Sequence, residues 1–386
     1  MGNSINPFIV SGRIPAEYFC DREKEMEQLE KSLTNQLNVV LTASRRMGKT
    51  SLTDQVLSRP DITGNYITIT VDILQTTTLR EFIMTLGSEV FSAVATRSDR
   101  LRRLFATLLK SLSASFGYDT VLNTPTFDIR LGDIQQPEYT LREIFDYLEA
   151  VDRRCLVVID EFQQITRYPE KNVEALLRTH IQRLTNVNFV FAGSSRRIME
   201  EMFLSASRPF YQSARALKLE AIDAGVYADF AMRLFSLSGK RLEPDAFRFA
   251  YDTFQGVTFY VQRLLKDAFA ETGKGGRCDV EMMTRLANDF IDESDSHLRE
   301  QLSFISETQK ELLYAIHAEG QVQSITSATF NRKHRLRSPS STQSAAIKLL
   351  EYDLITRKEK VYSLSDPLLS LWLDRQKPSS TKLPMR

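Results

Sequence analysis

The fold is decided by the stretch Asn38-Val39-Val40-Leu41-Thr42-Ala43-Ser44-Arg45-Arg46-Met47-Gly48-Lys49-Thr50-Ser51-Leu52. Its apolar first part predicts a buried β-strand, and the part from Gly48 to about Ser58 predicts a helix. A tight loop that carries Gly-Lys-Thr between a strand and a helix is typical of a phosphate-binding P-loop, because N–H groups at a helix N-terminus point at the anion. The plain alternative is an ordinary loop that precedes a helix.

Within this loop, each residue type has an expected role toward a nucleotide. Lys49 would reach the β- and γ-phosphates of ATP, and the Thr50 hydroxyl would bind Mg²⁺. Gly48 allows a close approach of the backbone to phosphate, since it has no Cβ. The first glycine of the usual pattern is replaced by Ala43, so we expect a slightly reshaped loop. The predicted nucleotide-binding residues are Ala43, Ser44, Arg45, Arg46, Met47, Gly48, Lys49, Thr50 and Ser51.

Composition places the chain among ordinary globular proteins. It has 386 residues, of which 42% are hydrophobic and 26% are charged, enough for two or three domains. A formal net charge of +1 gives no global attraction to nucleic acid or membrane. Cys20, Cys155 and Cys278 are widely spaced and odd in number, which indicates reduced thiols, and no apolar run approaches the ~18 residues of a membrane span. We therefore expect a cytoplasmic protein.

A second motif is the run Cys155-Leu156-Val157-Val158-Ile159-Asp160-Glu161-Phe162-Gln163-Gln164. An uninterrupted apolar run that ends in two carboxylates is typical of a central strand in a parallel sheet, with its charges at the C-terminal edge. Asp160 would hold Mg²⁺, directly or through water, and Glu161 would act as the general base on the attacking water. A core strand followed by a charged turn is the alternative, but it weakens once the P-loop is considered.

A third apolar strand, Val187 to Gly193, ends in Ser194-Ser195-Arg196-Arg197. In this position a polar side chain can sense the γ-phosphate, so Ser194 or Ser195 is a candidate. Arg196 would stabilise charge in the transition state. A solvated basic turn is the alternative for Arg196, Arg197 and Arg208.

Two other regions of the first half are less specific. Phe19 and Arg22 lie in an aromatic-Arg-Glu stretch that would contact adenine, or that simply starts a helix with acidic residues in its first turn. Tyr118 to Leu131 predicts a hairpin or irregular strand pair, and the role of residues 97–135 stays unassigned.

From Asp223 the pattern is helical, with helices predicted over Asp223–Leu237, Pro244–Phe254, Thr258–Glu271 and Val280–Ser303. This group would form a lid over the nucleotide, and Arg263 is a weak candidate to face the phosphates. Three further helices, over Glu307–Glu319, Ser327–His334 and Thr342–Leu354, precede an alternating hairpin from Ile355 to Leu364. Three helices and a hairpin predict a winged helix-turn-helix.

The winged-helix region is locally basic. From residue 331 to residue 386 there are 12 Lys and Arg against 5 Asp and Glu, a local net charge of +7. Clustered positive charge is what binding to the phosphates of double-stranded DNA uses. Docking of a partner protein or autoinhibition is the alternative. The candidate DNA contacts are Arg332, Lys333, Arg335, Arg337, Arg357, Lys358 and Lys360 to phosphate, and Ser341, Thr342 and Gln343 near the bases.

Taken together, these motifs resemble one family. Tyr18-Phe19-Cys20-Asp21-Arg22-Glu23, Arg45-Arg46-Met47-Gly48-Lys49-Thr50-Ser51-Leu52, Val158-Ile159-Asp160-Glu161-Phe162-Gln163, Ala192-Gly193-Ser194 and the segment from Tyr362 to Leu373 resemble the archaeal-type ATPases of archaea and bacteria. These belong to the STAND branch of P-loop NTPases and are related to AAA+ origin-recognition initiators. The resemblance implies an AAA-like nucleotide domain, a helical lid, a C-terminal winged helix and an ATP-dependent switch. The family's Gly-x-Pro in the lid appears here as Gly256-Val257-Thr258, which puts recognition of the base in question.

The sequence thus predicts an α/β AAA+-like P-loop NTPase with a parallel central sheet. Its domains would be residues 1–219 (ATPase), 220–300 (helical lid) and 301–386 (winged helix). The first hypothesis is an ATPase switch that uses ATP and Mg²⁺. It includes a homo-oligomer in which an arginine of one subunit reaches the γ-phosphate bound by its neighbour. The second is a DNA-binding regulator in which nucleotide is a structural ligand with negligible hydrolysis. A sensor whose winged helix binds a partner protein is the third.

Overall fold

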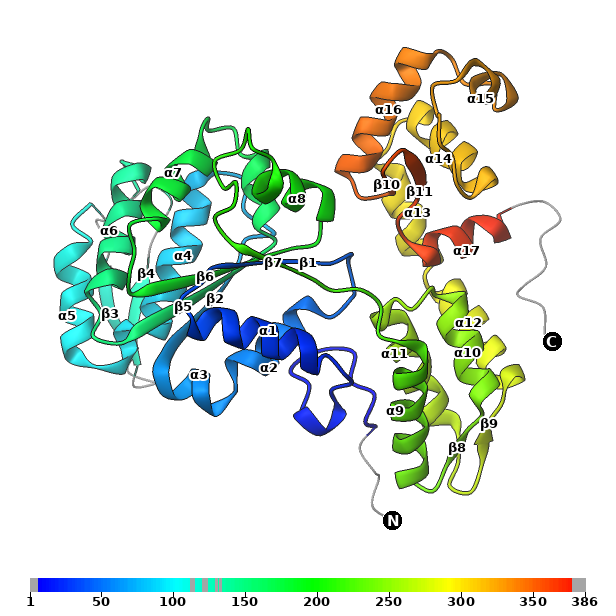
Figure 1. The fold of residues 1–386 in the computed structure, drawn as a ribbon, viewed down its shortest axis with the longest axis horizontal. Coiled ribbons are helices and arrows are strands. Elements are labelled where there is room, and N and C mark those ends of the chain that lie inside the picture. The colour runs from blue at the N-terminus through cyan, green and yellow to red at the C-terminus, as the bar shows by residue number, and fades with distance from the viewer. Residues whose placement is uncertain (1–5, 112–114, 120–123, 129–130, 132–133, 377–386) are drawn as a thin grey trace. The chain divides into compact units, whose positions relative to one another are not determined.

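The structure, a computed structural model, describes residues 6–111, 115–119, 124–128, 131 and 134–376. These residues divide into two compact units, drawn in Figure 1. We call residues 13–16 and 22–220 the sheet unit, and residues 6–12, 17–21 and 221–376 the helical unit. Within the described residues, no helix is both long and apolar enough to cross a membrane.

The sheet unit is organised by parallel strands. Its main strands are β1 (Val39–Thr42), β2 (Tyr66–Asp72), β5 (Arg154–Asp160), β6 (Val187–Gly193) and β7 (Arg215–Lys218). Among the described residues they form one sheet in the order β2-β5-β6-β1-β7, and every neighbouring pair is parallel. Because β6 lies between β1 and β5, the ends of all three strands meet at one edge. The predicted fold class is confirmed.

Helices cover both faces of this sheet. They are α1 (Glu23–Thr34), α2 (Lys49–Leu57), α3 (Pro60–Asn65), α4 (Leu79–Ala93), α5 (Asp99–Leu108), α6 (Pro137–Ala150), α7 (Val173–Ile181) and α8 (Arg196–Leu204), with short 3-10 turns at Ala95–Arg97 and Phe162–Arg167. Figure 1 shows α1, α2 and α3 on one face and α4, α6 and α7 on the other. On β5, Cys155, Val157 and Ile159 join the core beneath α4 and α6, and the alternate residues Leu156 and Val158 are equally buried. Burial on both faces explains the continuous apolar runs of the central strands.

A separate hairpin pairs β3 (Ser115–Asp119) with β4 (Thr124–Asp128) in antiparallel register. This agrees with the strand pair predicted near Tyr118–Leu131, of which residues 120–123 and 129–130 lie outside the described residues.

The helical unit begins with α9 (Ala224–Leu237), α10 (Pro244–Thr253), α11 (Thr258–Glu271), α12 (Val280–Glu293) and α13 (Asp295–Ser303), and with a short pair of β8 (Arg241–Leu242) and β9 (Arg277–Cys278). The single helix predicted over Val280–Ser303 is wrong, because the chain turns at Ser294 and divides it into α12 and α13. At the break, the Ser294 hydroxyl bonds the Phe290 carbonyl at 2.8 Å, a contact that competes with backbone hydrogen bonding.

The remaining elements of the helical unit are α14 (Glu307–Glu319), α15 (Ala328–Lys333), α16 (Pro339–Glu351), the antiparallel hairpin β10 (Ile355–Lys358) and β11 (Val361–Leu364), and α17 (Pro367–Arg375). They match the predicted winged helix-turn-helix. One continuous hydrophobic cluster joins α9–α12 to α14, α16 and α17. The hydrophobic core therefore continues across residues 300–301, where the boundary between lid and winged helix is expected. This domain boundary stays a prediction.

The N-terminal segment adds an unpredicted feature. Phe8 is fully buried in the helical unit, where its ring packs against Phe235 and Phe269 at centroid distances of 5.6 and 5.8 Å. The Asn6 side-chain amide donates to the Lys266 carbonyl at 2.8 Å. The chain thus contributes to the helical unit before it enters the sheet unit.

Candidate functional site

The P-loop connects β1 to α2 in the sheet unit. Gly48 is the N-cap of α2 with φ +87°, a left-handed conformation that favours glycine, and Arg46 also has a positive φ of +67°. Ala43 is 1% exposed and packs inside, so the methyl group at this position is accommodated. The first N–H groups of α2 have no partner within the helix, which makes this loop suited to an anion.

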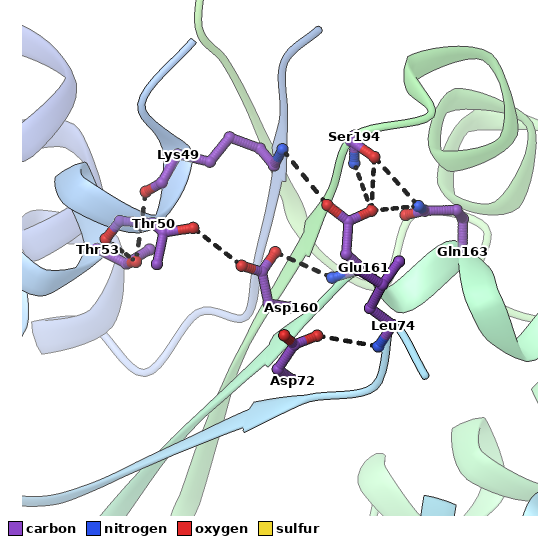
Figure 2. A network of polar contacts seen from close by, with 9 residues as sticks. All are labelled: Lys49, Thr50, Thr53, Asp72, Leu74, Asp160, Glu161, Gln163 and Ser194. Atoms are coloured by element: carbon purple, nitrogen blue, oxygen red, sulfur yellow. Dashed lines mark hydrogen bonds and ion pairs between the residues drawn. The ribbon is translucent and has the colours of Figure 1, made fainter. Parts of the chain in front are cut away.

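The P-loop meets the second motif through a direct contact. The Thr50 hydroxyl donates a hydrogen bond of 3.0 Å to Asp160 Oδ2, and the Glu161 N–H donates one of 2.9 Å to Asp160 Oδ1 (Figure 2). Asp72 ends β2 opposite Asp160 in the sheet register, and one of its carboxylate oxygens accepts from the Leu74 N–H at 2.9 Å. The sheet therefore brings the predicted hydroxyl and carboxylate together.

Glu161 follows Asp160 in a left-handed conformation, with φ +56°. This turn directs its carboxylate toward Lys49, whose ammonium lies 3.9 Å from Glu161 Oε1, and toward the end of β6. Ser194 donates to Glu161 Oε2 from its hydroxyl at 2.5 Å and from its backbone N–H at 3.4 Å. The Gln163 side-chain amide donates to the same oxygen at 2.5 Å. Four predicted site residues, Lys49, Thr50, Asp160 and Glu161, thus lie together with Ser194.

The two carboxylates at the site differ in pKa. The pKa of Asp160 is above its ordinary value, mainly because the group is buried. The positive charge of Lys49 lowers this pKa in part, and the negative charge of Glu161 raises it. Burial also acts to raise the pKa of Glu161, but the hydrogen bond from Ser194 and the charge of Lys49 outweigh it, so this pKa is below its ordinary value. Glu161 is therefore ionised at neutral pH, the form that a general base requires.

The donor set fits Mg²⁺. This ion prefers hard oxygen ligands, takes one or two from protein and keeps water and substrate phosphates in its other positions. The Thr50 hydroxyl and the Asp160 carboxylate are such oxygens, and their 3.0 Å contact places both within reach of one ion. Among the described residues there is no cluster of three His, Cys, Asp or Glu side chains that would form an all-protein metal site.

The arginines after β6 have carboxylate partners in this structure. Arg196 pairs with Glu200 at 2.8 Å and with Glu220 at 3.6 Å. Arg197 pairs with Glu201 at 3.4 Å, and Arg208 pairs with Glu174. A catalytic role for Arg196 stays a prediction.

Three further site candidates, Arg22, Phe19 and Arg263, lie in different parts of the two units. Arg22 is 4% exposed with φ +76°, and its guanidinium donates to the Glu220 carbonyl at 2.6 Å. Phe19 is half-buried and belongs to the helical unit, whereas Arg22 belongs to the sheet unit. Arg263 pairs with Asp267 at 2.7 Å and Glu293 at 2.9 Å inside the helical unit.

In the winged helix, most of the predicted phosphate-contacting residues are exposed. Arg332, Arg335, Arg337, Lys358 and Lys360 lie on the surface without an ion pair to any residue that the structure describes. Lys333 pairs with Glu319 at 2.6 Å, and the Arg357 guanidinium lies against the Tyr362 ring at 5.8 Å from its centroid.

One base-contact prediction is wrong. Thr342 is 2% exposed, and its hydroxyl donates to Asn331 Oδ1 at 2.7 Å and contacts the Ser338 carbonyl at 2.9 Å. Its side chain therefore faces the interior between α15 and α16 and cannot reach DNA bases. Ser341 is half-buried, and Gln343 is exposed on the same helix.

Comparison with known families agrees with this geometry. Residues 19–264 match a family model described as an ATPase domain predominantly from Archaea, and residues 296–375 match one described as "Probable winged helix domain". The chain belongs to this ATPase family. The family prediction is thereby confirmed, while membership of the STAND branch stays a prediction.

Solved structures with the same fold span the whole chain. A Walker-type ATPase of Pyrococcus abyssi has 18% identity and a TM-score of 0.65, covering 95% of this ATPase-family chain and 99% of that protein. The Aeropyrum pernix ORC2 protein, in ADPNP and ADP complexes, has 15% identity and a TM-score of 0.61, with 97% of each chain covered. The Aeropyrum pernix ORC1 protein in complex with DNA has 13% identity and a TM-score of 0.54, with 96% of each covered. No curated protein sequence matches this chain significantly.

Gln163 is the residue at this site to which the sequence assigned no role. The sequence does show that Gln163 lies two residues after Glu161, the candidate general base. The hydrogen bond to Glu161 depends on the 3-10 turn at Phe162–Arg167, which the sequence pattern does not specify.

Proposed function

We propose that this protein is a nucleotide-dependent switch that hydrolyses Mg·ATP to ADP and phosphate in the sheet unit. The observation that carries the proposal is the convergence of Lys49, Thr50, Asp160 and Glu161 from two distant segments at one edge of the sheet. Membership of the ATPase family supports the same reaction.

In the proposed reaction, the backbone of the P-loop and the Lys49 ammonium hold the β- and γ-phosphates. The Glu161 carboxylate accepts a proton from a water molecule as the water oxygen forms a bond to the γ-phosphorus. The bond between that phosphorus and the bridging oxygen breaks, and its electron pair stays on ADP. Bound Mg²⁺, held by Thr50 and Asp160, would supply charge stabilisation to the phosphates. Ser194, whose hydroxyl donates to Glu161 Oε2, is proposed to hold that carboxylate and to sense the γ-phosphate.

The winged helix is proposed to bind double-stranded DNA. Arg332, Arg335, Arg337, Lys358 and Lys360 are exposed and form no ion pair within the described part of the chain, so they are suited to phosphate contacts. A protein of the same fold, Aeropyrum pernix ORC1, has been solved with DNA. Lys333 and Arg357 would add contacts if they left their present partners, and Gln343 is the exposed residue proposed to lie near the bases.

Other parts of the proposal follow the sequence. Phe19 and Arg22 are proposed to contact the adenine, residues 220–300 to act as a lid, and Arg196 to stabilise transition-state charge after exchange of its carboxylate partners. We also propose a cytoplasmic location, and a homo-oligomer in which an arginine of one subunit acts on its neighbour.

Phosphate release from Mg·ATP by the full chain, with and without duplex DNA at moderate salt, tests the proposal. Turnover that DNA stimulates and that Glu161→Gln abolishes is expected for a DNA-coupled switch. A turnover rate that does not change when DNA is added would indicate that the winged helix binds a partner protein. No turnover above the Glu161→Gln blank favours the alternative, a DNA-binding regulator with nucleotide as a structural ligand.

A further inference from the structure

The carboxylate of Glu161 is held asymmetrically. Its Oε2 atom accepts from the Ser194 hydroxyl, the Ser194 N–H and the Gln163 amide, at 2.5, 3.4 and 2.5 Å. Its Oε1 atom has the Lys49 ammonium at 3.9 Å, beyond hydrogen-bond distance. Figure 2 shows Ser194 and Gln163 on one side of the carboxylate and Lys49 on the other. One oxygen is therefore anchored, and the other is directed toward the side on which the P-loop lysine lies.

Gln163 makes this contact at a cost to its own hydrogen bonding. The side chain is 5% exposed, and its carbonyl oxygen is buried without a hydrogen-bond partner among the described residues. Exchanging the two ends of the amide would place that carbonyl against the Glu161 carboxylate, which is repulsive, so the orientation is set by Glu161. A buried acceptor without a protein partner lowers stability, so the bond to Glu161 rather than the satisfaction of both ends of the amide sets this orientation.

The adjacent glutamine shows the contrast. The Gln164 amide donates to the Thr76 carbonyl at 3.0 Å, and its carbonyl accepts from Arg167 at 3.4 Å. Both ends of this side chain are satisfied, and neither contacts Glu161. Gln164 therefore has the bonding expected of a structural residue.

The end of β6 is shaped to admit Gln163. A Cβ atom at Gly193 would lie 2.5 Å from the Gln163 carbonyl oxygen and 2.6 Å from the Met199 side chain. Any residue larger than glycine at this position would displace both of these side chains. Gly193 and Ser194 are consecutive, so β6 supplies both the room for Gln163 and the second donor to Glu161.

We propose that Gln163 is a positioning residue: together with Ser194 it anchors Glu161 Oε2, so that Oε1 faces the water that attacks the γ-phosphate. The inference rests on the proposed function, in which Glu161 accepts the proton of that water. The Gln163 amide contacts Glu161 and, at 3.4 Å, the Ser194 hydroxyl, so its proposed effect on catalysis passes through the position of the Glu161 carboxylate.

The test compares Gln163→Met with Gln164→Met in the full chain, by steady-state phosphate release from Mg·ATP. Methionine keeps the length of glutamine and removes both amide groups. For Gln163→Met we expect kcat to fall about tenfold, the effect of one misaligned hydrogen bond, with KM for ATP within about twofold of the wild type. The matched control Gln164→Met is expected to keep the wild-type kcat.

A double-mutant cycle gives a readout that a purely structural role would not move. In the Glu161→Gln background, whose residual hydrolysis is followed by single-turnover measurements, Gln163→Met should cause no further loss, because its effect passes through the carboxylate. Gly193→Ala keeps the glutamine but displaces it, and we expect the same loss of kcat as for Gln163→Met. This second variant keeps the test valid if one of the proteins fails to fold.

Several results would overturn the inference. An unchanged or increased kcat in both Gln163→Met and Gly193→Ala would mean that the anchor is dispensable or inhibitory. A raised KM with unchanged kcat would assign Gln163 to nucleotide binding. Failure of the proposed function looks different: Glu161→Gln would then hydrolyse ATP as fast as the wild type.

Discussion

The Thr50 hydroxyl and the Asp160 carboxylate are joined by a 3.0 Å hydrogen bond across 110 residues of sequence. The contact forms because β1 and β5 are separated by a single strand, β6, in a parallel sheet. Parallel strands end at the same edge, so the helix that follows one strand lies beside the carboxylates that follow the other. This arrangement places a candidate pair of metal ligands next to the P-loop.

If Thr50 and Asp160 share Mg²⁺, Thr50→Val should weaken binding of Mg·ATP by about ten- to a hundredfold, since one charge-assisted contact of about 1.5–3 kcal/mol is lost. Isothermal titration calorimetry with and without Mg²⁺ measures the effect. Binding of metal-free ATP should change little. Thr53→Val is the matched control, because the Thr53 hydroxyl bonds only backbone carbonyls of the same helix. Equal weakening with and without Mg²⁺ would contradict the assignment.

For the winged helix, the combined change of Arg332, Arg335 and Arg337 to Ala should weaken binding to duplex DNA. It should also reduce the slope of log K against log salt by about 3, since each phosphate contact contributes about 1. Fluorescence anisotropy at several salt concentrations measures both quantities. Arg285→Ala is the control, because Arg285 is already paired with Glu271 and Asp289. Unchanged affinity in the triple variant would favour partner docking.

Phe8→Ala tests the packing of the N-terminal segment into the helical unit. Removing a fully buried phenylalanine from contact with Phe235 and Phe269 should lower the free energy of unfolding by about 3–5 kcal/mol. Leu237→Ala, at a residue that is 74% exposed, should change it little. Chemical denaturation followed by circular dichroism gives both values. A Phe8→Ala protein as stable as the Leu237→Ala protein would show that residues 6–12 do not pack as described.

The three cysteines should differ in reactivity. Burial raises the pKa of the Cys155 and Cys278 thiols to about 12 each, so that almost no thiolate exists at neutral pH, and both side chains are inaccessible. Cys20 is half-buried. Iodoacetamide followed by mass spectrometry should label Cys20 alone in the folded protein and all three cysteines in denaturant. Rapid native labelling of Cys155 would mean that the central strand β5 is accessible.

The sequence predicted those features that depend on local pattern. The apolar runs of β1, β5 and β6, and the order of Gly48, Lys49, Asp160 and Glu161 along the chain, identified the sheet and the edge at which these four residues lie. A strand that is buried on both faces contains few polar residues, so the central strands can be predicted from sequence alone.

The features that it missed depend on tertiary context. The edge strand β7 (Arg215–Lys218) has a single buried residue, so its pattern carries little signal. The helix expected over Thr342–Leu354 begins earlier, at Pro339, because Ser338 is its N-cap and Pro339 its first residue. Thr342 therefore lies one turn inside α16, with its side chain buried. The contact of Gln163 with Glu161 requires the left-handed turn at Glu161, which no periodicity indicates.

The proposed role of Glu161 is tested most directly by single-turnover hydrolysis of bound Mg·ATP by the wild-type chain and by Glu161→Gln, at matched nucleotide occupancy. If Glu161 is the general base, Glu161→Gln binds ATP as tightly as the wild type and converts it to ADP at least about a hundredfold more slowly. Equal rates of conversion in the two proteins would contradict the role of Glu161, and with it the proposed ATPase switch.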